Sequence, residues 1–209
     1  MIKIENTDVY GWEAAIRGAR NPMNSWGMMD TAFWCYPEDG VAHELGPNDY
    51  KLLRNLTNAG PDHGKFMRMI TVSLDITAPL YWWKEFDTYK VGTVANSCST
   101  MHKIHAKEFT LDDFSHDHMY EGSIDHLCGL IRWLNLCREG FLDTKNKDDW
   151  WQMIQLLPTS YNQRRTVLLN YQVLKSMYHA RKNHKLDEWH VFCNWIRSLP
   201  YSELITNEG

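Results

Sequence analysis

An alternation of apolar and polar residues over residues 66–77 marks the clearest strand in the chain. The apolar positions are Phe66, Ile70, Val72, Leu74 and Ile76, and the positions between Ile70 and Thr77 that face the other way are short or polar. A period of two is typical of a sheet with one face on the core. Arg68 shares the apolar face, so we expect it near a strand end, with its guanidinium reaching solvent.

Capping and chain-breaking residues predict the other elements of the first half. Asp8 suits the cap of a helix, and Gly60-Pro61 and Gly92 suit helix ends. The predicted elements are a strand over 2–5, a helix over 9–19, an ordered irregular stretch over 21–47, a helix begun by Asn48 or Asp49, a helix over 79–90 that starts at Pro79, and an extended or irregular stretch over 91–108.

Apolar residues at helical spacing dominate the second half of the chain. The predicted helices are one that carries Ile124, Leu127, Ile131 and Leu134 between Ser123 and Gly140, one over 148–156, one over 163–181 with Val167, Tyr171, Leu174 and Tyr178 on one stripe, and one over 186–198. Strands early and helices late predict an α+β fold. We expect an antiparallel or mixed sheet packed with helices, in one domain over residues 1–209.

Composition narrows the class of protein. The 209 residues are 44% hydrophobic and include ten Trp, which need a packed core or an interface to cover them. The net charge of −4 shows no footprint for a nucleic acid polymer. No apolar run approaches about 18 residues, and the N-terminus does not resemble a signal peptide, so we expect no membrane span.

Cysteine and histidine patterns predict neither disulfides nor a metal site. The five Cys form no C-x-x-C pair, so buried or half-buried free thiols in a reducing cytoplasm are expected. The run His116-Asp117-His118 suggests metal ligands, but no helical H-x-x-x-H or Cys pair accompanies it. Surface or hydrogen-bonded histidines are the favoured interpretation.

Candidate chemistry gathers in one tract, residues 84–102. The tract follows the predicted strand and a helix started by Pro79, and it runs into a hydroxyl-rich segment that contains Gly92. Hydroxyl and backbone N–H groups in such a loop can hold a phosphate, and Lys90 would supply the charge. The alternative is a capped turn packed on the core, and the tract by itself favours that alternative.

This tract resembles the signature of the flavin-dependent thymidylate synthases, R-H-R-x-x-S-x-N-E-x-S-x-R-Y. Thr88, Tyr89 and Lys90 stand where that family has Arg-His-Arg. With one extra residue allowed, the other counterparts are Thr93 and Ser99 for the two Ser, Asn96 for Asn, Ser97 for Glu, Met101 for Arg and His102 for Tyr. Lys84-Glu85 stands where the family has Arg-Gln, and Phe66 matches the Phe of its preceding strand motif, H-x-S-x-F-E-H.

The C-terminal half is similar to the same family in order and spacing. Leu157-Pro158 is followed by Asn170, Leu174 and Arg181, as in the family's Leu-Pro pair and N-x-x-x-L helix that ends in Arg. On one helix, Asn170 and Arg181 would share a face about 16 Å apart. Such a face suits an extended ligand with a ring at one end and an anion elsewhere. The alternative is that Arg181 is only a favourable charge at a helix C-terminus.

The resemblance implies a ligand set and a site. Members of the family hold FAD and deoxyuridine monophosphate (dUMP) at a homotetramer interface, and a folate supplies one carbon. The resemblance assigns cofactor binding to His63, Tyr89, Lys90, Thr93 and Asn170, and it assigns substrate binding to Glu85, Asn96, Ser97, Ser99 and Arg181.

Several charged residues of the family motif are replaced in this chain. Thr88 and Met101 stand for arginines, and Ser97 stands for a carboxylate. Each lost charge-assisted hydrogen bond costs about 1.5–3 kcal/mol, so nucleotide binding would weaken unless other cations take their place. The candidates are Arg68, Arg164, Arg165 and Lys103.

Three functions therefore stay open. The first is an enzyme that transfers folate-derived carbon to C5 of a pyrimidine deoxynucleotide. The second is a non-catalytic relative that keeps the fold and the oligomer and binds a nucleotide or nothing. The third is a different base such as deoxycytidylate, because Ser97 and Glu85 change the hydrogen-bonding groups near the expected ring site.

Overall fold

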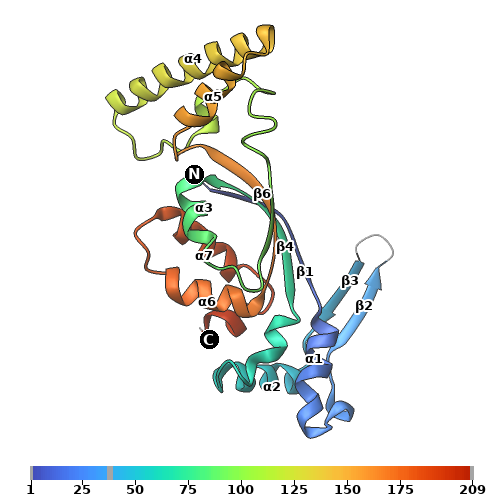
Figure 1. Ribbon diagram of the computed structural model, residues 1–209. Coiled ribbons are helices and arrows are strands. Elements are labelled where there is room, and N and C mark those ends of the chain that lie inside the picture. Colours follow the sequence, from blue (N-terminus) through green and yellow to red (C-terminus); the bar gives the residue numbers. More distant parts are fainter. Residues whose placement is uncertain (1, 37–39, 208–209) are drawn as a thin grey trace. The chain divides into compact units, whose positions relative to one another are not determined.

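Four strands form the main sheet of the structure. The computed structural model describes residues 2–36 and 40–207. The strands are β1 (Lys3–Tyr10), β4 (Thr71–Pro79), β5 (Val94–Ser97) and β6 (Asn162–Asn170), and they form an antiparallel sheet in the order β1-β4-β6-β5 (Figure 1). Helices account for most of the remaining regular structure, so the predicted α+β class is confirmed.

The chain divides into two units built from interleaved segments. Unit 1 comprises residues 1–5, 75–88 and 95–167, and unit 2 comprises residues 6–74, 89–94 and 168–209. Unit 1 contains α3 (Leu80–Phe86), α4 (Glu121–Thr144) and α5 (Lys147–Leu156). Unit 2 contains α1 (Trp12–Arg20), α2 (Pro47–Asn58), α6 (Tyr171–Arg181), α7 (Asp187–Arg197) and α8 (Glu203–Thr206). A single domain over residues 1–209 stays a prediction.

Strand β4 keeps the predicted alternation but begins later than predicted. Val72, Leu74, Ile76 and Ala78 are buried, while the residues between them are half-buried. Residues 66–68 belong instead to a 3-10 helix, Gly64–Arg68, and the next residue, Met69, bonds back from its N–H to Phe66 O at 2.9 Å. Phe66 and Met67 are both buried, which a strand with one buried face does not permit. Arg68 is exposed on this 3-10 turn.

The predicted helix over 163–181 is wrong in its first half, which forms strand β6. Gln163, Val167 and Leu169 are buried and the residues between them are more exposed, which is the period of a strand. Val167 lies four residues before Tyr171, so it fits the predicted helical stripe as well as the buried face of the strand. The helix proper begins at Tyr171, and all four residues of the predicted stripe, Val167, Tyr171, Leu174 and Tyr178, are buried.

Two predicted helix caps are also wrong. Asp8 lies within β1, and α1 begins after Gly11, whose φ of 92° turns the chain from strand to helix. Helix α2 begins at Pro47, so Asn48 and Asp49 lie inside its first turn. Its cap comes from a distant residue, because the carboxylate of Asp30 accepts hydrogen bonds from the N–H groups of Asn48 and Asp49.

Part of the stretch predicted to be irregular is a β-hairpin. Strands β2 (Ala32–Tyr36) and β3 (Gly40–Glu44) pair antiparallel, with Ala32 opposite Glu44 and Phe33 opposite His43. Residues 37–39 of the predicted irregular stretch lie outside the described residues. Two 3-10 turns, Asn21–Met23 and Trp26–Met28, precede the hairpin.

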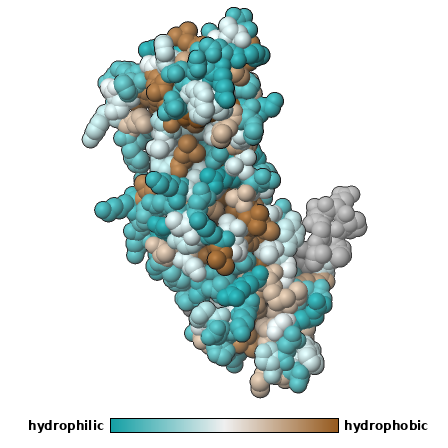
Figure 2. Space-filling view, viewed as in Figure 1, coloured by the Kyte–Doolittle hydropathy of each residue, from teal (hydrophilic) through white to brown (hydrophobic). Residues whose placement is uncertain are grey.

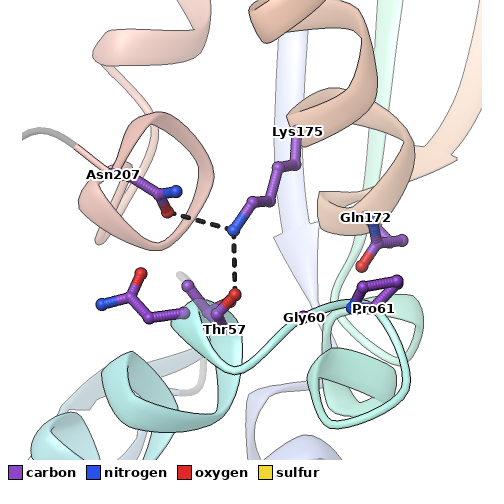
Figure 3. A pocket seen from close by; sticks show the side chains of 7 residues that line it. Thr57, Gly60, Pro61, Gln172, Lys175 and Asn207 are labelled. Atoms are coloured by element: carbon purple, nitrogen blue, oxygen red, sulfur yellow. Dashed lines mark hydrogen bonds between the residues drawn. The ribbon is translucent and has the colours of Figure 1, made fainter.

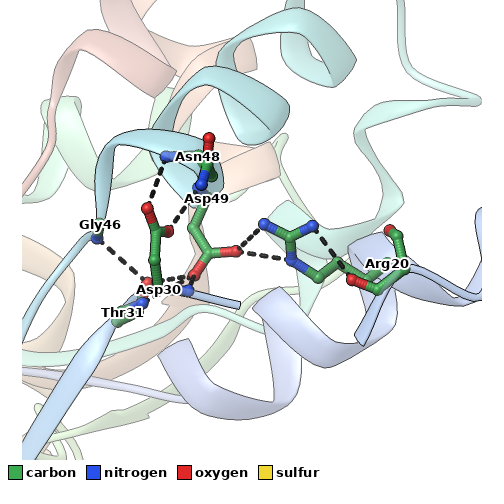
Figure 4. A network of polar contacts seen from close by, with 7 residues as sticks. Arg20, Asp30, Thr31, Gly46, Asn48 and Asp49 are labelled. Carbon is green, nitrogen blue, oxygen red and sulfur yellow. Dashed lines mark hydrogen bonds and ion pairs between the residues drawn. The ribbon is translucent and has the colours of Figure 1, made fainter. Parts of the chain in front are cut away.

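A buried ion pair ties α1, α2 and the start of the hairpin together in unit 2 (Figure 4). Arg20 is 3% exposed and Asp49 is fully buried, and Arg20 Nε donates to Asp49 Oδ1 at 2.7 Å. The other carboxylate oxygen of Asp49 accepts from the N–H groups of Asp30 and Thr31 and from the Thr31 hydroxyl. Arg20 also donates to Ser25 O. Both charges thus have partners, which a buried charge needs.

Unit 1 has its own hydrophobic cluster around α4 and α5, which pack against each other. The buried members are Ile104, Phe109, Phe114, Leu127, Ile131, Leu134, Cys137 and Met153. Both helices agree with the predicted positions, although α4 runs past Gly140 to Thr144. Exposed apolar side chains of α4 include Trp133 and Leu136, at 51% and 59% exposure. Figure 2 shows scattered hydrophobic residues, in brown, on the surface.

Four of the five cysteines are described, and all four are free thiols. Cys137 and Cys193 are buried and Cys128 is half-buried, whereas Cys98 is exposed, contrary to prediction. The side chain of Cys35 lies outside the described part of the structure. Within the described residues, no helix has both the length and the apolar character required to cross a membrane.

Replacing Asp49 by Asn tests the contribution of the buried pair. The substitution leaves the Arg20 guanidinium buried without a counter-charge, so we expect a loss of about 3–5 kcal/mol in the free energy of unfolding. Urea denaturation measures it. The matched control is Glu13→Gln, because Glu13 pairs with Arg17 at an exposed site, and its loss should stay near about 0.5 kcal/mol. Equal losses in the two variants would contradict this account.

The same pair predicts a pH dependence. Burial acts to raise the pKa of Asp49, but hydrogen bonds from Thr31, Arg20 and the Asp30 backbone outweigh it and hold the pKa below the usual 3.8. The unfolded chain therefore takes up this proton first, so the stabilisation is complete above the usual pKa and is lost as pH falls through the lower, folded value. Urea titrations between about pH 6 and 3 should show a fall in stability that is smaller in Asp49→Asn.

Candidate functional site

The turn from β6 into α6 places the first candidate residue, Asn170. This residue ends the strand and is the N-cap of the helix, where its side-chain oxygen accepts a hydrogen bond from Val173 N at 3.0 Å. Asn170 thus precedes the helix instead of lying on its face, which corrects the shared-face argument drawn from a continuous helix. Leu174 and Met177, which lie between Asn170 and Arg181, are fully buried and contribute to the core.

Arg181 is the last residue of α6 and lies against two aromatic rings of unit 2, those of Tyr89 and Trp189. Its Nε donates to the hydroxyl of Tyr89 at 2.9 Å. The guanidinium carbon lies 4.8 Å from the ring centroid of Trp189 and 5.6 Å from that of Tyr89. The two rings lie edge to face with their centroids 6.2 Å apart. Stacking and the hydrogen bond together restrict the orientation of a planar fork that recognises carbonyl and phosphate oxygens.

The segment Tyr89–Val94 touches both ends of α6. Tyr89 reaches Arg181 at the C-terminal end. At the other end Gly92 has a φ of 79°, and a β-carbon at this position would lie 3.0 Å from Asn170 Nδ2 and 3.1 Å from Val173 Cγ2. The close approach and the left-handed backbone both require glycine here. The structure therefore brings residues 89–94, Asn170 and Arg181 together within unit 2.

Two further candidates in this segment differ in their surroundings. Thr93 is half-buried, and its hydroxyl oxygen is buried with no hydrogen-bond partner in the described part of the chain. An orphaned buried hydroxyl is unusual and fits a site that a bound group completes. Lys90 is exposed. His63 is also exposed and stands at the start of the 3-10 turn, where its backbone N–H donates to Gly60 O.

The remaining candidates belong to unit 1. Asn96 and Ser97 are exposed residues of β5. The hydroxyl of Ser99 accepts hydrogen bonds from the N–H groups of Met101 and His102, so it closes a turn. Glu85 is half-buried in α3, and its backbone carbonyl accepts from Thr88. These contacts support the capped-turn alternative for the second half of the tract.

Two of the four residues proposed to replace the missing arginines of the family motif, Arg164 and Arg165, form ion pairs with carboxylates. In unit 1, Arg165 donates to Asp87 at 2.7 Å and lies 4.2 Å above the ring of the buried Trp83. Arg164 donates to Asp75 at 2.8 Å. Arg68 and Lys103 are exposed. The structure therefore shows no rebuilt cluster of free arginines among these four residues.

Trp189 is a site residue that the sequence did not reveal as one. It was expected only as the start of a helix, whereas it lies in the first turn of α7 and is fully buried against Arg181. Its spacing of eight residues from Arg181, across a short loop, is the signal that was available. Among the described residues, no cluster of His, Cys, Asp and Glu side chains has the arrangement of a metal site.

Comparisons with known proteins reveal likeness in structure but not in sequence. No protein-family model and no curated protein sequence matches the chain. Two solved structures of the flavin-dependent thymidylate synthase ThyX from Helicobacter pylori, each with FAD and dUMP, match with TM-scores of 0.68 and 0.70 at 14% and 13% identity. The matches cover 98% and 99% of this chain and 98% of each ThyX chain.

A second solved protein is similar over almost its whole length. The UMP/dUMP methylase PolB from Streptomyces cacaoi, bound with 5-Br dUMP, matches with a TM-score of 0.62 at 13% identity, over 100% of this chain and 96% of the PolB chain. At these identities the comparisons establish the architecture. The chain has the fold of the flavin-dependent thymidylate synthases, with a sequence that has diverged far from the solved members.

Proposed function

We propose that this chain binds a pyrimidine deoxynucleotide of the dUMP type, with Arg181 as the principal contact. The observation that carries the proposal is the Arg181 guanidinium oriented by its hydrogen bond to Tyr89 and its contact with the Trp189 ring, together with a Thr93 hydroxyl that lacks a partner among the described residues. The fold supports it, because the similar ThyX and PolB structures hold dUMP and 5-Br dUMP. A planar guanidinium can donate two parallel hydrogen bonds to a phosphate group, or can donate to a carbonyl oxygen of a pyrimidine ring.

FAD is the proposed cofactor, as in the ThyX structures. Lys90, Thr93 and Asn170 would hold it, and the orphaned Thr93 hydroxyl is the feature of this chain that fits such a group. When bound, FAD would supply the hydride for the transfer of a folate-derived carbon to C5 of the pyrimidine. The protein's part is to bind and orient two anionic ligands, and Tyr89 contributes by fixing the plane of Arg181.

The remaining substrate contacts would come from Glu85, Asn96, Ser97 and Ser99. They belong to unit 1, whereas Arg181 belongs to unit 2. In the proposal a homotetramer of the family type supplies them, so that each site is completed by more than one copy of the chain. His63 would contribute to the cofactor side of the site.

A second candidate function is a non-catalytic nucleotide-binding relative with the same fold. The specific observation in its favour is that Arg164 and Arg165 are already paired with Asp75 and Asp87. The replaced arginines at Thr88 and Met101 therefore have no substitute in these two residues. Such a protein would bind the nucleotide weakly and would perform no transfer at C5.

One set of measurements tests the proposed function and separates it from the second candidate. The purified protein should show flavin absorbance, or acquire it with added FAD, and should bind dUMP in calorimetry. Release of tritium from 5-labelled deoxyuridylate in the presence of methylene-folate and a reductant for the flavin reports transfer at C5. Nucleotide binding without tritium release supports the non-catalytic relative. A protein that binds neither FAD nor dUMP rejects both functions.

Replacing Arg181 by Gln should weaken dUMP binding by about tenfold or more, because charge-assisted hydrogen bonds worth about 1.5–3 kcal/mol are lost. Arg181→Lys should recover only part of the affinity, since Lys offers a point charge. The matched control is Arg197→Gln. Arg197 also ends a helix and also stacks on a ring, that of Tyr178. Equal weakening in both glutamine variants would remove Arg181 from the site.

A further inference from the structure

A small hollow in unit 2 is lined by none of the residues assigned to nucleotide or cofactor binding, although its lining residue Gly60 accepts a hydrogen bond from the backbone of His63 (Figure 3). It opens between the C-terminal end of α2, the loop at Gly60-Pro61, helix α6 and Asn207. Its volume is about 280 Å³, at the lower limit of the roughly 300–1,000 Å³ that drug-sized ligands occupy. The hollow therefore suits a small molecule and excludes a dinucleotide.

Lys175 supplies the only charge in the lining of this hollow. Its Nζ donates to the backbone oxygen of Thr57 at 3.1 Å and to Asn207 Oδ1 at 3.0 Å (Figure 3). An ammonium group has three donors, so one N–H is left without a protein acceptor. Within the described part of the chain, Lys175 forms no ion pair with a carboxylate. Among residues 2–36 and 40–207, Lys175 is therefore a half-buried cation without a counter-charge.

The other polar groups around Lys175 are amides. Asn58, Gln172 and Asn207 line the hollow, and no Asp or Glu does. Asn207 turns its oxygen toward Lys175, so its amide nitrogen keeps both donors for another acceptor. Carbonyls at the end of α2 disfavour a negative charge, but one of them, Thr57 O, is already bonded to Lys175. The lining as a whole offers donors and one positive charge.

We infer that this hollow is a binding site for a small oxyanion, a carboxylate or inorganic phosphate, held by Lys175. The anion accepts the unused N–H of Lys175 and hydrogen bonds from the neighbouring amides. Charge-assisted bonds of this kind are about twice as strong as neutral ones. Burial lowers the pKa of Lys175, and a bound anion would oppose that shift because a nearby negative charge favours the charged form of an amine. The site does not depend on nucleotide or flavin binding.

Calorimetric titration of the full chain with sodium phosphate and, separately, with sodium succinate at constant ionic strength tests the site. At least one anion should bind the wild type, and its dissociation constant should rise about tenfold or more in Lys175→Gln. The two titrations distinguish phosphate from carboxylate as the preferred oxyanion. The matched control is Lys185→Gln, because Lys185 is an exposed lysine of the same unit, and its affinity should stay within about twofold of wild type.

A second variant tests the anion site if Lys175→Gln does not fold, and a competition experiment tests whether this site differs from the dUMP site. If Lys175→Gln does not fold, as judged by thermal melting, Gln172→Ala should still weaken anion binding severalfold while it leaves the charge in place. Saturating dUMP should leave phosphate affinity unchanged, because the two sites differ. The inference is overturned if neither anion binds, if the variants bind as wild type does, or if dUMP displaces phosphate. A protein that binds phosphate but not dUMP rejects the proposed function alone.

Discussion

The hydrogen bond from Val173 N to the side chain of Asn170 marks the point where β6 becomes α6. Adjacent to it, Tyr171 N donates to Ile70 O, so the same turn is joined to the chain just before β4. With the start of α6 fixed, its eleven residues place Arg181 at the far end, beside Tyr89 and Trp189. Loss of this cap would cost about 0.5–2 kcal/mol and would weaken the start of the helix that carries the guanidinium on which the proposed nucleotide site rests.

Local patterns predicted those elements whose burial follows a single period. The alternation over Val72, Leu74 and Ile76 gave β4, and the stripe of α4 gave its helix. The patterns failed at β6, where Val167 lies at helical spacing from Tyr171 and also on the buried face of the strand. It also failed at α2, whose cap is Asp30, seventeen residues before the helix begins. A cap supplied from outside the local sequence leaves no signal next to the helix that it starts.

The features of the candidate site also differ in whether the local sequence could predict them. The sequence placed Asn170 and Arg181 on one face of a continuous helix, whereas Asn170 is the last residue of β6 and only Arg181 lies in α6, as its final residue. The contacts of Arg181 with Tyr89 and Trp189 join residues from three separate segments, so only the folded chain could show them. Thr93 was predicted from a motif, but its unpartnered hydroxyl is a property of packing.

The pairing of Arg165 with Asp87 and of Arg164 with Asp75 determines which groups control access to these two arginines. An incoming anion would have to displace a carboxylate that already holds each guanidinium. Replacing Asp75 or Asp87 by a neutral residue would therefore release an arginine for anion binding, although neither arginine is changed.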